Sequence, residues 1–69
     1  MHQGTSISKR EQQVLKLIAQ EFSSKEIAEK LYLSAHTVMS HRKNLMQKLM
    51  VRNGAGLVRE GFMRGLLAL

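Results

Sequence analysis

Residues 23–50, SSKEIAEKLYLSAHTVMSHRKNLMQKLM, decide the fold of this chain. They begin with a capping box, in which a serine hydroxyl accepts a hydrogen bond from a backbone amide and a glutamate three residues on reaches back. Apolar residues then recur three and four positions apart, which is helical spacing. The pattern breaks at residues 32–34 and resumes after Ser34, a good N-cap residue. The stretch therefore predicts a short helix over 24–31, a tight turn and a longer helix over 35–50.

Two further helices are predicted on either side of this unit. A second capping box at residues 8–11 should start a helix over 9–22. Asn53 is a good cap for a last helix over 54–64, and Gly65 is suited to a left-handed C-cap. Because proline is absent and strand patterns are scarce, we predict an all-α fold, a four-helix bundle that contains a helix-turn-helix.

The length and composition bound the class of protein. A chain of 69 residues has room for one domain. We expect residues 1–6 to be a flexible N-terminal arm and residues 7–69 to form the domain. The chain has no cysteine, which suits a reducing compartment, and no apolar run of membrane-spanning length. We therefore expect a cytoplasmic protein without a membrane partner.

Each predicted helix should bury one apolar stripe. In a helix-turn-helix the two helices cross steeply, so a small residue is needed where they meet, and Ala28 is placed to pack on Val38. The predicted core residues are Val14, Leu15, Ile18 and Phe22, then Ile27, Ala28 and Leu31, then Val38, Leu45 and Leu49, and finally Ala55, Val58, Phe62 and Leu66.

The positive charge is one-sided. The formal net charge is +6, and residues 31–69 hold six bases and one acid, whereas residues 1–30 hold five bases and four acids. Such asymmetry suggests a polyanionic partner, nucleic acid before an acidic membrane surface. The plainer alternative is a solvated basic face, to which Arg42, Lys48 and Arg52 would contribute only a general positive field.

One side of the helix predicted over 35–50 is polar and faces away from the core. At about 100° per residue, with Val38 as the core direction, its outward residues lie roughly opposite that direction or flank it. Lysine can donate to guanine acceptors, and serine and glutamine can pair with base edges or phosphate. The residues predicted to face the bases are His36, Met39, Ser40, Lys43 and Gln47.

Other residues should contact phosphate. The start of the helix predicted over 24–31 offers amide groups, the positive end of a helix dipole and a lysine, and the start of the next helix offers two hydroxyls. Ser24 and Ser34 could instead serve only as caps, and Lys25 could be a solvated cation. The predicted phosphate contacts are Ser24, Lys25, Ser34 and Thr37.

No group of side chains suggests catalysis or a cofactor. His36 and His41 are five residues apart and lie on different helix faces, with no cysteine or aspartate near them, so a metal site is not expected. Ser40 and His41 diverge as adjacent helical residues, and no carboxylate orients them. We therefore predict no enzyme activity, no cofactor and no small-molecule ligand.

Together these stretches resemble the LuxR/FixJ/GerE-type DNA-binding output domain, over residues 7–67. Each matching piece is weak alone, but all of them in order at these spacings make a strong match. The pieces are ISKREQQVLKLIAQ, SSKEIAEKLYLSAHTV, His41, Asn44, KLMV at 48–51 and GLL at 65–67.

The resemblance implies a LuxR-type C-terminal effector domain, unrelated to the winged helix, that binds double-stranded DNA as a homodimer and regulates transcription on the bacterial nucleoid. RNA polymerase is a candidate partner. Positions matching Met39, Ser40 and Lys43 typically face DNA in the family, and the last helix is the dimer contact. Gly61 lies on a face that a second copy could approach closely, so the predicted dimer contacts are Leu57, Gly61 and Arg64.

The chain departs from the family where a conformation or a contact would matter. Met39 stands where the family usually has lysine or arginine, and methionine could instead contact a thymine methyl. Glu21 replaces a usual glycine, so we expect the first helix to continue and the turn to fall at Phe22–Ser23. Tyr32 is an unusual residue for the second turn if a positive φ is required there.

Two alternatives stay open. A sigma-factor promoter-binding region shares this helix-turn-helix pattern, although His41 and Asn44 favour the LuxR type. The other alternative is a helix-turn-helix fold that binds only a protein partner, because Met39, Met46 and Met50 could form an adaptable apolar patch.

Overall fold

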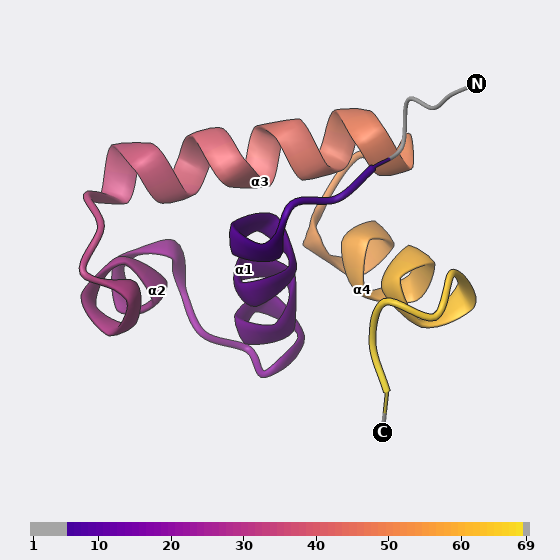
Figure 1. The fold of residues 1–69 in the computed structure, drawn as a ribbon, viewed down its shortest axis with the longest axis horizontal. Coiled ribbons are helices and arrows are strands. Elements are labelled where there is room, and N and C mark those ends of the chain that lie inside the picture. The colour runs from indigo at the N-terminus through magenta and orange to yellow at the C-terminus, as the bar shows by residue number, and fades with distance from the viewer. Residues whose placement is uncertain (1–5, 69) are drawn as a thin grey trace.

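The structure, a computed structural model, describes residues 6–68, which form helices and no strand within that range. The helices are α1 (Lys9–Ala19), α2 (Ser24–Leu31), α3 (Ala35–Leu49) and α4 (Gly54–Met63). Figure 1 shows α1 at the centre, packed against the other three, with the long α3 lying across it along one edge of the molecule. The predicted all-α, helix-turn-helix fold is confirmed. Most of the predicted arm, residues 1–5, lies outside the described residues.

Every helix begins at a polar cap whose side chain accepts a hydrogen bond from an amide three residues on. Ser8 and Ser23 head complete capping boxes with glutamates, and Ser34 and Asn53 cap α3 and α4. These caps satisfy amides that would otherwise lack a partner at each helix start. Ser24 is therefore the first helical residue of α2 and not its cap.

A left-handed residue follows the last helical residue of every helix within one or two positions, and only one of these residues is glycine. The positive φ angles are 70° at Glu21, 56° at Tyr32, 59° at Met50 and 75° at Gly65. In each case the following amide donates to a carbonyl five residues back, as Leu33 does to Ala28 at 2.9 Å and Leu66 to Gly61 at 2.7 Å. This closure satisfies the last free carbonyl groups of a helix.

The prediction that the first helix would run to residue 22 is wrong. Helix α1 ends at Ala19, and the Phe22 amide donates to the Leu17 carbonyl at 3.1 Å. Glu21 adopts the left-handed conformation although it has a Cβ, so the turn forms where a glycine would have placed it. The positive φ considered for Tyr32 is present, and the tyrosine side chain is almost fully exposed.

The predicted core is confirmed for the first three helices, except at their edges. Phe22 and Leu31 are only partly buried and pack around the core. Ala28 is buried beside α3, as the crossing of α2 and α3 requires. The residues confirmed as buried are Val14, Leu15, Ile18, Ile27, Ala28, Val38, Leu45 and Leu49.

The predicted orientation of the last helix is wrong. Leu57 is fully buried in α4, whereas Ala55 and Phe62 are exposed and Val58 is only partly buried. The reason is that the chain folds back after α4. The Gln12 side chain donates to the Leu66 carbonyl at 3.2 Å, and Leu67 fills the core beside α1.

This rotation also overturns two of the predicted dimer contacts. A Cβ at Gly61 would lie 2.6 Å from Leu67 Cδ1 and 3.3 Å from Leu15 Cδ2. The face that carries Leu57 and Gly61 is thus filled by the chain's own side chains and is closed to a second copy. Arg64 is exposed, and its Nε lies 3.0 Å from Glu60 Oε1.

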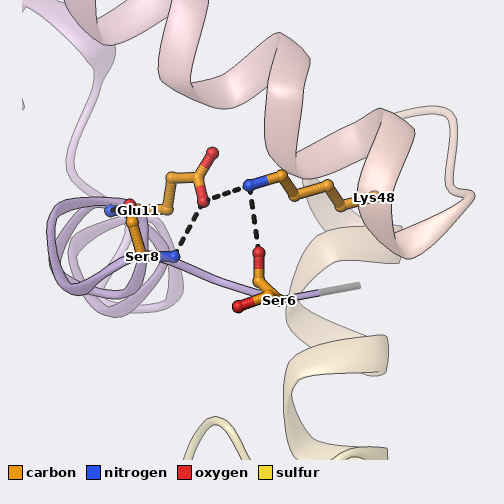
Figure 2. Close-up of polar contacts among 4 residues, drawn as sticks. All are labelled: Ser6, Ser8, Glu11 and Lys48. Carbon is orange, nitrogen blue, oxygen red and sulfur yellow. Dashed lines mark hydrogen bonds and ion pairs between the residues drawn. The ribbon is translucent and has the colours of Figure 1, made fainter. Parts of the chain in front are cut away.

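A partly buried ion pair joins the start of α1 to the end of α3. Glu11 is 4% exposed, and its Oε1 lies 2.8 Å from Lys48 Nζ, which also donates to the Ser6 carbonyl at 3.0 Å (Figure 2). Burial raises the pKa of Glu11, but the hydrogen bonds from Lys48 and Ser8 and the lysine charge outweigh it, so the pKa lies below 4.5. Lys48 is therefore a structural cation and adds little to the outer field.

Candidate nucleic-acid interface

Helix α3 presents its polar side to the outside of the molecule. Val38, Leu45 and Leu49 hold its inner side in the core with at most 1% exposure. The residues predicted to face the bases are all exposed, including Met39 at 61%, although their contact with DNA stays a prediction. These residues are His36, Met39, Ser40, Lys43 and Gln47.

An open depression lies between the start of α2 and the outer side of α3, which we call the α2–α3 depression. It brings together four of the five predicted base-facing residues with one predicted phosphate contact. Gln47 is not part of it and lies about one turn further along α3. The depression is lined by Ser24, His36, Met39, Ser40, Arg42, Lys43 and Met46.

Arg42 and Met46 are the two lining residues that the sequence analysis did not place there. They lie about 40° and 80° from Val38 around the helix, between its core side and its outer side. Both are partly buried. Long unbranched side chains at such flanking positions run along the core edge and expose their ends. Their side-chain length, combined with their angle, was the signal that could have identified them.

The predicted phosphate contacts differ in what their side chains can still donate. The Ser34 hydroxyl accepts from the Thr37 amide at 3.0 Å and donates to Thr37 Oγ1 at 2.9 Å. Its proton is thereby used, whereas the Thr37 hydroxyl keeps its own proton for another acceptor. Lys25 is exposed in the first turn of α2 and has no ion pair within residues 6–68.

Ion pairs with acidic side chains leave few cations to supply the positive electrostatic field around α3. Lys48 is paired with Glu11, and Arg59 and Arg64 are paired with Glu60 at 3.2 and 3.0 Å. Across the part of the chain that the structure describes, no acidic side chain pairs with Arg42 or Lys43. The local positive field of the α2–α3 depression therefore comes chiefly from Lys43, because the guanidinium of Arg42 reaches toward Gly54, where Nη2 would lie 3.4 Å from an added Cβ.

Residues 6–68 hold neither a membrane-spanning helix nor a cluster of metal ligands. No helix there has both the length and the apolar content needed to cross a membrane. No three His, Cys, Asp or Glu side chains in that range gather closely enough to hold a metal ion.

A short bracing helix, a tight turn and a longer helix with an exposed cationic side define a helix-turn-helix domain. The family model for bacterial regulatory proteins of the luxR family matches residues 5–60, and the chain belongs to this family. The solved structure of the transcription factor GerE superposes with a TM-score of 0.85 and 31% identity, over 90% of this chain and 92% of that one.

The chain is also similar to curated proteins. The oxygen regulatory protein NreC of Staphylococcus carnosus is 44% identical over 61 residues, which are 88% of this chain. NreC of Staphylococcus aureus is 43% identical over the same length. The chain spans 28% of the length of each of these relatives.

Proposed function

We propose that this domain binds specific double-stranded DNA sequences and thereby regulates transcription, with α3 in the major groove. The observation that supports this most is the exposed side of α3, which carries Lys43 and adjoins the start of α2. The major groove of B-DNA admits an α-helix and displays a distinct pattern of donors and acceptors for each base pair. The role is one of binding and not of catalysis, on the nucleoid in the bacterial cytoplasm.

The two helices divide the contacts. The outward residues of α3 would read base edges, with Lys43 as the donor to guanine. Lys25, the Thr37 hydroxyl and the first amides of α2 would contact phosphate and fix the register of the domain on the duplex. Ser24 lies beside these groups and would donate its hydroxyl proton or its backbone amide to phosphate. Ser34, whose hydroxyl donates to Thr37, would donate its backbone amide.

Two domains would act together on half-sites one turn of DNA apart, because one helix reads too few base pairs for high specificity. The contact between copies would involve α4, as the family resemblance implies. Since Leu57 and Gly61 are buried, we assign it to the outer side of α4, where Ala55 and Phe62 are exposed. Arg64 is exposed at the end of the same helix.

The test begins with selection of a binding site from a random duplex library, followed by fluorescence anisotropy on that site. Lys43→Ala should weaken binding to the selected site more than binding to random DNA, whereas Lys25→Ala should weaken both equally. Lys16→Ala, an exposed lysine on α1 outside the α2–α3 depression, is the control and should change neither. A duplex with two half-sites should saturate at two domains.

Salt dependence supplies a second readout. If about four phosphates are neutralised per domain, log K should fall against log salt with a slope of roughly −3.6. A slope near zero, or equal binding by the parent and both lysine variants, would contradict the proposal.

The match to the luxR family favours this function over a sigma-factor promoter-binding region. The protein-interaction alternative depends on a methionine patch. Met39 and Met46 share the depression, but Met50 does not line it and stands 86% exposed after α3. Failure of the selection to enrich any sequence, with no retention on DNA, would favour that alternative.

A further inference from the structure

The α2–α3 depression has an apolar strip inside a cationic surface. Met39 and Met46 are seven residues apart, so they lie within about 20° of each other on α3. Met39 is 61% exposed, and Met46 is partly buried and packs against the core. Arg42 and Lys43 occupy the turn between the two methionines and line the same depression. The strip is therefore anchored on the core at Met46 and bordered by the positive charge of Lys43.

The combination of charge and apolar surface restricts what can occupy the depression. Unpaired cations attract a polyanion, but methionine side chains can neither pair with phosphate nor donate to a base. In the major groove the C5-methyl group of thymine is the apolar group that a base pair displays. A thymine edge thus meets both requirements, because its methyl would face the strip while flanking phosphates face the cations.

We propose that Met39 and Met46 form a contact for a thymine C5-methyl group, so that the half-site carries a thymine opposite the side of α3 between these two methionines. The inference rests on the proposed function and adds a preference for one base, thymine, within the half-site. Residues near the start of a recognition helix contact base edges, and Met39 is the fifth residue of α3. The flexible, polarisable methionine side chain can adapt its shape to a methyl group.

Removal of a single methyl group from the DNA tests this contact. In the selected half-site each thymine is replaced in turn by deoxyuridine, which keeps every donor and acceptor and removes only the methyl group. At one position the parent domain should bind about fourfold more weakly, which corresponds to ~0.8 kcal/mol for one buried carbon group. Positions outside the α3 contact should show no change.

Two methionine variants complete the experiment. Met39→Ala should bind thymine and deoxyuridine duplexes nearly equally at that position, because Met39 supplies the exposed half of the contact and Met46 is partly buried. Met39 is exposed, so the variant should fold, as circular dichroism can verify. Met63→Ala changes an exposed methionine on α4, away from the strip. This variant should keep the fourfold preference for thymine over deoxyuridine.

The outcomes separate the two proposals. Specific DNA binding with no thymine–deoxyuridine difference at any position would overturn the methyl contact and leave the DNA-binding function standing. A difference that persists in Met39→Ala would also overturn the assignment to this strip. Absence of any specific DNA binding would instead refute the proposed function itself, and with it the methyl contact.

Discussion

A single missing side chain, at Gly61, controls the packing of the C-terminal part of the chain. Helix propensity alone treats an interior glycine as a weakness of about 1 kcal/mol relative to alanine. In the folded molecule its surroundings leave no room for a side chain, since Leu67 and Leu15 occupy the space of the missing Cβ. The glycine is thus needed for the close approach of Leu67 to α4.

We expect Gly61→Ala to lower the free energy of unfolding by about 1–3 kcal/mol, because overpacking of a tight core outweighs the gain in helix propensity. Urea unfolding monitored by circular dichroism measures the change. Gly54→Ala is the control, since a Cβ there would make only ordinary contacts, the nearest with Arg42 at 3.4 Å. Stabilisation by Gly61→Ala would show that Leu67 does not pack as described.

At the scale of helices, the ends are as well defined as the starts. Each start follows a local rule, a polar cap with an amide three residues on. The ends need a left-handed residue, which costs a residue with a Cβ roughly 1–2 kcal/mol. Glu21, Tyr32 and Met50 adopt this conformation without being glycine. The tertiary packing of the following segments, such as Val51 after α3, stabilises these strained positions.

Met50→Gly should raise the free energy of unfolding by about 0.5–1 kcal/mol. Relief of the left-handed strain exceeds the extra backbone entropy that glycine gives the unfolded chain. Little packing is lost because Met50 is 86% exposed. Met63→Gly, at the exposed last residue of α4, should instead destabilise the domain by up to about 1 kcal/mol. Thermal melts of both variants check the opposite signs.

Across the whole molecule, the Glu11–Lys48 pair links segments that are far apart in sequence. It connects the start of α1, the end of α3 and the backbone of Ser6 (Figure 2). Because the pKa of Glu11 is lowered in the folded state, its contribution to stability is present above pH 4.5 and is lost as the pH falls through the lowered value.

Lys48→Met should reduce the free energy of unfolding by about 1–2 kcal/mol at pH 7, because it leaves a buried carboxylate with fewer partners. The difference from the parent should shrink below about pH 4.5, where protonated Glu11 no longer needs the cation. Urea unfolding of the variant and the parent at several pH values measures this difference in the free energy of unfolding. The pKa values of Glu26 and Glu60 are lowered too, by hydrogen bonds from Ser23 and Arg64, so the comparison with the parent isolates Glu11.

Lys43→Met provides the matched control for that series. It removes a positive charge from the same helix at an exposed position without an ion pair in residues 6–68. Its effect on stability should be small at every pH. A gap between Lys48→Met and the parent that did not change with pH would mean that Lys48 acts through packing alone.

The sequence by itself determined the features that depend on neighbours along the chain. Capping residues, apolar spacing and the short turn predicted α2, α3 and the outward side of α3, because hydrogen bonds over three residues and a period of 3.6 are local properties. The stripe of Val38, Leu45 and Leu49 was correct for the same reason.

Only the tertiary structure decided the features that depend on segments meeting in space. The return of Leu67 onto α1 turned Leu57 and Gly61 into core residues and left Phe62 exposed. The crossing of α2 and α3 brought Ser24, Arg42 and Met46 into one depression. Folding also paired Lys48 with Glu11, which removed a cation from the outer field. Sequence spacing specifies directions around one helix, whereas the partner that each side meets is set by how the helices pack together.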